Sequence, residues 1–300
     1  MKVVVAGGSG SLGRLISADL ARAGHEVVVL TRRPRPGVPG RQVPWDGRTR
    51  GAWADELSGA ALINLCGVLV DRPPTAANIA LLTRSRVEPT LALAEAARLA
   101  GAPLAWIQMS TLAIYGDAGD QVLDETARPA DGPPQMAGVA RAWEEAAASA
   151  TAGRVVVLRT GIVLDPAGPA MRRLCSLVRF GLGGRISSGR QWVSWLHAAD
   201  FLAIMRAALT DRNLAGITHA TSPNPVTNAE LMAGLRHVLR RPPAPPTPAW
   251  LLQAGALLLR SDPALALTGR RCVPGRLLNS GFAFSHADIE PALADLLRRT

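Results

Sequence analysis

The chain contains one tyrosine, Tyr115, and one lysine, Lys2. A Tyr-x-x-x-Lys pair, which can move a proton and hold a ribose, therefore cannot occur anywhere in the sequence. Whatever chemistry the protein carries out must use other side chains.

Cysteine is also scarce. Cys66, Cys175 and Cys272 are odd in number and far apart, and they lack the spacing of metal ligands. We therefore expect reduced thiols, a cytoplasmic protein and no metal site. No run reaches the roughly 18 unbroken apolar residues of a membrane helix. The sequence starts with a strand pattern and not with a signal peptide, so we expect no membrane partner.

The formal net charge is +10, but the basic residues are dispersed and form no run of five or more. This pattern predicts no nucleic-acid partner. An excess of positive charge instead favours an anionic small molecule as cofactor or substrate. The oligomeric state that we expect is a monomer or a homodimer.

Residues 3–13, VVVAGGSGSLG, combine a buried strand pattern with a glycine-rich turn, and an amphipathic helix follows. Gly7 allows a tight turn, Gly10 lets the backbone approach a pyrophosphate, and Gly13 lets the helix pack on the strand. The diphosphate of a dinucleotide would bind at the helix N-terminus. The expected contact residues are Gly7, Ser9, Gly10, Ser11, Leu12 and Gly13.

Strand and helix patterns alternate through the first 165 residues, which predicts an α/β fold of the Rossmann type, a doubly wound parallel sheet with helices on both faces. The expected strands are Val3–Ala6, Val27–Leu30, Leu62–Leu65, Leu104–Met109, Arg154–Leu164 and Gly216–Ala220. The expected helices include Leu12–Ala23, Ala76–Ala100, Gln135–Ala150 and Trp195–Leu209. We assign residues 1–164 to the dinucleotide-binding domain, with 191–220 returning to it. A smaller C-terminal substrate lobe would comprise 165–190 and 221–300.

Thr31, Arg32 and Arg33 directly follow the second expected strand. An acidic residue there would bind the adenosine ribose and select NAD, whereas arginine suits a 2′-phosphate. The position predicts NADP as the cofactor. The alternative is a solvated loop in an arginine-rich chain.

Small or polar residues end two further strands. Leu65, Cys66 and Gly67 would let the backbone approach the adenine and ribose of the cofactor. Met109 would also border the cofactor, and the hydroxyls of Ser110 and Thr111 could bind a substrate carbonyl. Tyr115 could face the same cleft, or could pack at a turn.

His197 and Asp200 lie three residues apart near an expected helix start. A helix cap or a hydrogen bond between lobe and core explains them better than a metal site or a catalytic triad.

Taken together, these residues resemble an extended short-chain dehydrogenase/reductase. Within that family, the sequence most resembles the atypical "epimerase family" branch, whose members carry a characteristic C-terminal domain. The motifs are the glycine pattern, Thr31-Arg32-Arg33, Asn64-Leu65-Cys66-Gly67, Ser110-Thr111 with Tyr115-Gly116, Ser85-Arg86-Val87, Arg141-x-Trp143-Glu144, Arg159-Thr160-Gly161-Ile162 and Gly189-Arg190-Gln191 before His197-x-x-Asp200. The resemblance implies a Rossmann fold, an NADP(H) site that includes Arg159, Gly161 and Ile162, and a substrate cleft under the C-terminal lobe.

The resemblance also shows where the sequence departs from the family. Counting back from Glu144 puts Met136 at the position of the usual tyrosine and Ala140 at that of the lysine, and neither can transfer a proton. Ser110, Thr111 and Tyr115 are the remaining catalytic candidates. Three functions stay open: an NADP(H)-dependent oxidoreductase or redox isomerase/epimerase acting on a small carbonyl or hydroxyl compound, a non-redox isomerase or cyclase, and a non-catalytic NADP(H)-binding sensor or scaffold.

Overall fold

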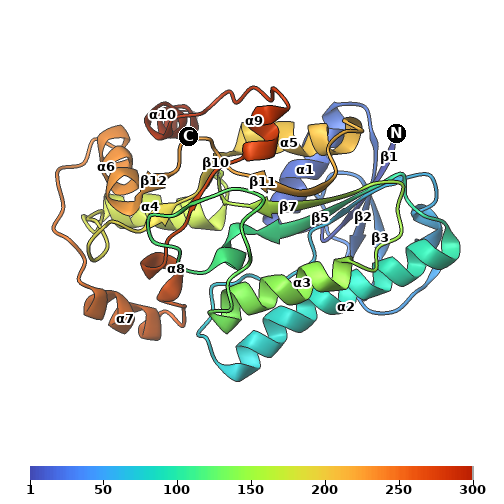
Figure 1. The fold of residues 1–300 in the computed structure, drawn as a ribbon, viewed down its shortest axis with the longest axis horizontal. Helices are drawn as coiled ribbons and strands as arrows, with labels where there is room; N and C mark the ends of the chain where they lie inside the picture. The colour runs from blue at the N-terminus through green and yellow to red at the C-terminus, as the bar shows by residue number, and fades with distance from the viewer. Residues whose placement is uncertain (299–300) are drawn as a thin grey trace.

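The computed structural model describes residues 1–298 and is built around a parallel sheet of seven strands in the order β3-β2-β1-β4-β5-β7-β11 (Figure 1). The strands are β1 (Lys2–Ala6), β2 (Glu26–Thr31), β3 (Arg41–Pro44), β4 (Ala61–Asn64), β5 (Ala105–Thr111), β7 (Val155–Thr160) and β11 (Gly216–Ala220). The strand order reverses between β1 and β4. This is the topological switch point, where open α/β sheets bind their ligands. The predicted fold class is confirmed.

Alternation along the strands divides the core between the two faces of the sheet. Val3 and Val5 pack with α1 (Ser11–Arg22) and α5 (Ala198–Thr210), whereas Val4 and Ala6 pack with α2 (Ala76–Ala100). Helix α3 (Val139–Ala147) lies beside α2 on that second face (Figure 1). A buried valine contributes roughly 1.5–3 kcal/mol, so the sheet is a rigid platform for the loops at its ends.

The C-terminal lobe has its own apolar core, which gathers segments that are distant in sequence. Leu164, Met171, Trp195, Leu235 and Leu293 meet there. The helices of the lobe are α4 (Pro169–Arg179), α6 (Asn228–Val238), α7 (Ala249–Leu258), α8 (Ala264–Leu267), α9 (Gly275–Asn279) and α10 (Ile289–Arg298). Three short strand pairs also lie outside the main sheet: β8 (Ile162–Leu164) with β10 (Trp195–His197), β9 (Trp192–Val193) with β12 (Val226–Thr227), and β6 (Val122–Leu123) with β13 (Arg271–Cys272).

Two predicted elements are wrong in detail. The expected strand Arg154–Leu164 is two strands, because the chain leaves the main sheet at Gly161. A Cβ at Gly161 would lie 2.6 Å from the Ser194 carbonyl oxygen, so only glycine allows this approach. The expected helix Trp195–Leu209 begins only at Ala198, since the three residues before it pair with β8. Within residues 1–298, no helix is long and apolar enough to cross a bilayer.

Candidate functional site

The glycine-rich turn joins β1 to α1 at the switch point. Gly7 has a φ of +80°, in the left-handed region that favours glycine. A Cβ at Gly13 would lie 2.5 Å from the Cα of Gly8, so the packing of α1 on the turn requires glycine there. A Cβ at Gly10, in contrast, would meet only the Gly7 carbonyl oxygen, at 3.4 Å. The fold itself does not require glycine at position 10. The close approach of a ligand to the backbone would explain why a glycine is there.

The N-terminus of α1 is open to an anion. Its capping residue, Gly10, makes no side-chain capping bond, and the first turn holds no acidic residue. The N–H groups of Ser11 and Leu12, together with the helix dipole, favour negative charge at this point. These residues fit the diphosphate of a dinucleotide.

The end of β2 lies beside this turn. The Thr31 hydroxyl donates a hydrogen bond to the Ser9 hydroxyl at 3.1 Å, which ties β2 to the turn. Arg32 and Arg33 follow and are exposed. The positive charge of Arg32 opposes the effect of burial on the pKa of the Cys66 thiol, which places Arg32 near the carboxyl end of β4. Burial nevertheless raises the pKa of Cys66 to about 12, and this side chain is therefore a neutral, apolar wall.

The loop after β4 is held by buried amides. The Asn64 side chain accepts a hydrogen bond from the Cys66 N–H at 3.1 Å and donates to Thr90 at 2.9 Å and to Gln108 at 3.0 Å. These bonds fix Leu65, Cys66 and Gly67 at the carboxyl end of β4. Their backbone can therefore form one wall of the crevice.

A buried polar network follows along β5 and β7. The Ser110 hydroxyl donates to a Glu144 carboxylate oxygen at 2.5 Å, and Arg159 pairs with the same carboxylate at 2.9 and 2.8 Å. Arg159 also donates to the Tyr115 hydroxyl oxygen at 2.7 Å, and that hydroxyl lies 2.6 Å from Nε2 of His219. The network joins strands β5, β7 and β11, helix α3 and the turn that ends at Tyr115 into one hydrogen-bonded chain.

The direction of these bonds follows from His219. Burial lowers the pKa of His219, which favours the neutral ring. Its Nδ1 lies 3.0 Å from the Val273 carbonyl oxygen, so Nδ1 carries the proton and donates. Nε2 then accepts from the Tyr115 hydroxyl. Tyr115 thus donates to His219 and accepts from Arg159, and burial raises its pKa to about 12.

Two of the expected site residues need correction. Tyr115 is 4% exposed, and its hydroxyl is engaged on both sides, so it does not face a cleft as a proton source. The Arg159 side chain is equally enclosed and points to Glu144 and Tyr115 and not toward a cofactor. Sequence reasoning missed His219 as a partner. No local spacing reveals it, because it comes from β11.

Replacing Tyr115 with phenylalanine is expected to lower the free energy of unfolding by about 1–3 kcal/mol. The change leaves a buried Arg159 donor and a buried His219 acceptor without their partner. Urea unfolding followed by circular dichroism measures the effect. Ser149→Ala, at an exposed position, is the control and should change stability by less than about 0.5 kcal/mol. Unchanged stability of Tyr115→Phe would contradict the network.

Thr111 is the one catalytic candidate that stays partly exposed, at the end of β5. Its hydroxyl oxygen accepts a hydrogen bond from the Ala113 N–H at 3.1 Å, and its proton can still be donated. Met136 lies in a π-helical turn, Pro134–Gly138, and Ala140 is buried in the first turn of α3. Met109 is buried at the end of β5 and accepts from Thr160, while Gly161 and Ile162 lead into β8.

A cavity of about 250 Å³ lies beyond the carboxyl edge of the sheet, between the loop after Tyr115 and two loops of the C-terminal lobe. Asp117, Asp120, Arg190 and Gln191 line it with polar groups. Arg190 lies 3.6 Å from Asp120. Such a lining suits a ligand with hydroxyl groups or charge.

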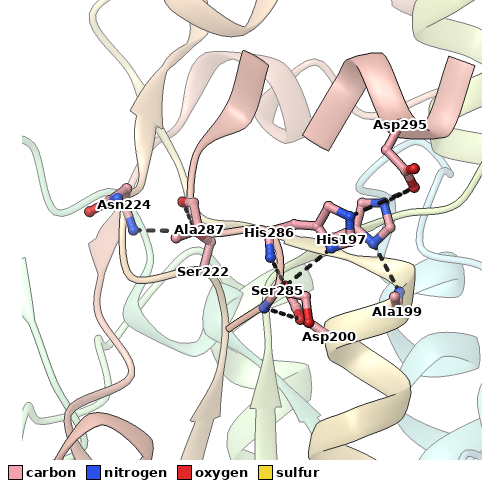
Figure 2. Close-up of polar contacts among 9 residues, drawn as sticks. All are labelled: His197, Ala199, Asp200, Ser222, Asn224, Ser285, His286, Ala287 and Asp295. Carbon is pink, nitrogen blue, oxygen red and sulfur yellow. Dashed lines mark hydrogen bonds and ion pairs between the residues drawn. The ribbon is translucent and has the colours of Figure 1, made fainter. Parts of the chain in front are cut away.

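His197 and Asp200 fasten the lobe to the core, as expected (Figure 2). Nδ1 of His197 accepts from the Ala199 N–H at 3.0 Å and thereby caps α5. Asp200 accepts the N–H groups of Ser285 and His286, both at 2.9 Å.

His197 and His286 stack at 3.6 Å, with Asp295 of α10 beside both rings (Figure 2). Ligand atoms of these three residues lie within 4.8 Å of one another, close enough for a metal. The cap uses the Nδ1 lone pair of His197, however, so the neutral ring carries its proton on Nε2, toward Asp295 at 3.4 Å. A proton at this position blocks metal ligation by His197, and the ion-pair contacts of the two histidines with Asp295 and Asp200 join the C-terminal lobe to the core.

Comparisons with known proteins cover almost the whole chain. The model of the NAD dependent epimerase/dehydratase family matches residues 3–219, and that of a domain of unknown function, DUF1731, matches residues 247–296. An epimerase family protein of Mycobacterium bovis is 35% identical over 295 residues, which are 97% of this chain and 96% of that protein. The human epimerase family protein SDR39U1 is 31% identical over 302 residues, covering 99% and 100%.

Two solved structures share the architecture. The crystal structure of human SDR39U1 (isoform 2) with NADPH matches with a TM-score of 0.85 at 30% identity, over 100% of both chains. A nucleoside-diphosphate sugar epimerase from Corynebacterium glutamicum matches with a TM-score of 0.79 at 32% identity, over 99% of this chain and 58% of that one.

Proposed function

This chain belongs to the NAD dependent epimerase/dehydratase family, and on that premise we propose that it is an NADP(H)-dependent oxidoreductase or redox epimerase acting on a small carbonyl or hydroxyl compound. One observation carries the proposal: the glycine turn, the open end of α1 and Arg32 lie together at the switch point of the sheet. The NADPH in the structure of the human relative supports the choice of cofactor.

Each part of the crevice has a role in this proposal. The first-turn N–H groups of α1 hold the diphosphate, and Gly10 leaves room for it. Arg32 and Arg33 bind the 2′-phosphate. When bound, the cofactor supplies or accepts a hydride. The Thr111 hydroxyl orients a substrate carbonyl, and the cavity lined by Asp117 and Arg190 holds the rest of the substrate.

No proton donor stands at the usual positions, because Met136 and Ala140 occupy them. A general acid is worth roughly 10²–10⁴ in rate, so turnover on simple carbonyl compounds should be slow unless the substrate or water supplies the proton. The enclosure of Tyr115 gives weight to a second candidate, an NADP(H)-binding protein without catalytic turnover. NADPH oxidation with a panel of carbonyl compounds separates the two.

Cofactor choice tests the proposal directly. We expect NADPH to bind at least about tenfold more tightly than NADH, a difference of about 1.4 kcal/mol. Arg32→Ala should remove most of this preference, because it takes away the charge that pairs with the 2′-phosphate. Calorimetric titration of both nucleotides measures the ratio.

Arg98→Ala is the matched control, since Arg98 is exposed in the last turn of α2, far along the chain from the crevice. This variant lowers the net charge equally and should leave the ratio unchanged. Equal affinities of the parent protein for NADPH and NADH would overturn the assignment of Arg32.

A further inference from the structure

Arg86 is a buried arginine in the middle of α2, and only 8% of the residue is exposed. Its guanidinium donates to the carbonyl oxygens of Leu82 and Val68, both at 3.1 Å. It also lies 5.1 Å from the centre of the Trp143 ring. The side chain is therefore held in one place by bonds to its own helix and to the loop after β4.

Among residues 1–298 no carboxylate forms an ion pair with Arg86. Arg159 differs in this respect, because it is also buried but pairs with Glu144 at 2.8 Å. Burial without a counter-ion lowers the pKa of Arg86 to about 10, which still leaves the group charged at neutral pH. Carbonyl dipoles and an aromatic face offset only part of the cost of a buried charge. The charge of Arg86 would therefore affect the binding affinity of an anionic ligand, or of a ligand whose charge changes.

The guanidinium lies against the cofactor crevice. A Cβ placed on Gly67 would lie 3.0 Å from Cζ of Arg86, so the arginine packs directly on the backbone at the end of β4. Trp143, on which it stacks, lies one helical turn after Ala140 in α3. The charge of Arg86 thus lies between the loop after β4 and Ala140 of α3, the position at which the family has a lysine.

A dinucleotide on this fold lies across the switch point, with one nucleotide on each side. Arg32 follows β2 and places the adenosine half there, so the nicotinamide half falls toward β5 and α3. Arg86 stacks on Trp143 of α3, one turn after Ala140, where the family's lysine would hold the nicotinamide ribose. The oxidised nicotinamide ring is a cation, and the reduced ring is neutral. A fixed positive charge on this side repels the first and not the second.

We propose that Arg86 is a positioning residue whose fixed charge makes the protein bind NADPH more tightly than NADP⁺. This inference rests on the proposed function, because it takes the crevice as the nucleotide site. It assigns to Arg86 a selectivity between the two redox states of one cofactor, which no ordinary packing role would produce.

The test compares dissociation constants for NADPH and NADP⁺, measured by calorimetry. We expect the parent protein to prefer NADPH at least about threefold, because the fixed charge repels the cationic ring of NADP⁺ and not the neutral ring of NADPH. Arg86→Met should bring the ratio close to one, whereas Arg86→Lys should keep the preference. Arg86→Gln, which removes the charge but retains a donor for the Val68 carbonyl, serves as the second neutral variant if the methionine variant does not fold.

Arg154→Met is the matched control. Arg154 also donates to backbone carbonyl oxygens, those of Leu214 and Ala208. It directly precedes β7 and therefore lies at the amino ends of the strands, opposite the crevice. This variant should lose stability and keep the NADPH/NADP⁺ ratio. A parent protein without preference, or neutral Arg86 variants that weaken both nucleotides equally, would overturn the inference and leave the proposed function standing. Failure of the parent protein to bind either nucleotide would overturn both.

Discussion

Glu144→Gln is expected to lower the free energy of unfolding by about 3–5 kcal/mol, because it leaves the buried Arg159 guanidinium without its counter-charge. The two side chains are only 3% and 15% exposed, and two short bonds join them. Glutamine keeps the shape of glutamate, so the loss reports the missing charge and not a cavity. Chemical denaturation monitored by circular dichroism gives the value.

Glu88→Gln is the control for this change. Glu88 pairs with Arg48 at 2.8 Å, but the two side chains are 36% and 68% exposed. An exposed pair contributes no more than about 1 kcal/mol. If Glu144→Gln cost as little as Glu88→Gln, the network of Ser110, Glu144 and Arg159 would not stabilise the carboxyl edge of the sheet.

Gly10→Val is expected to weaken NADPH binding at least about 100-fold, equivalent to about 2.7 kcal/mol, while the protein stays folded. The valine side chain would project where a diphosphate approaches the backbone. The fold should accept it, because a Cβ at this position has only one contact, at 3.4 Å. Fluorescence titration with NADPH and a circular dichroism spectrum together measure the two effects.

Gly255→Val, in the exposed helix α7, is the matched control and should bind NADPH as the parent protein does. Gly13→Val should behave differently from both variants. Its Cβ would lie 2.5 Å from the Cα of Gly8, so folding itself should fail. Normal NADPH binding by Gly10→Val would place the nucleotide site elsewhere.

Local patterns predict most of this fold. The strand β1, the turn from Gly7 to Gly13 and helix α1 are contiguous in sequence, and their glycine spacing follows from backbone geometry alone. The N-cap role of His197 could also be predicted, since a cap needs only its neighbours along the chain.

The polar network could not be predicted in the same way. His219 lies 104 residues from Tyr115, and Arg159 lies 15 residues from Glu144. Such contacts arise from the order of the strands and not from spacing along the chain. Arg86 shows the same limit, because a lone arginine in a helical pattern reads as a solvated position until its burial is known.

The last helix, α10, completes the apolar core of the C-terminal lobe, because Leu293 and Leu296 pack there with Leu164 and Trp195. Leu164 and Leu293 are far apart along the chain, so the apolar core of the lobe can close only after α10 has been made. Strand β1 and the nucleotide turn, in contrast, are neighbours along the chain and precede α10. During synthesis the nucleotide crevice can therefore begin to form before the lobe closes.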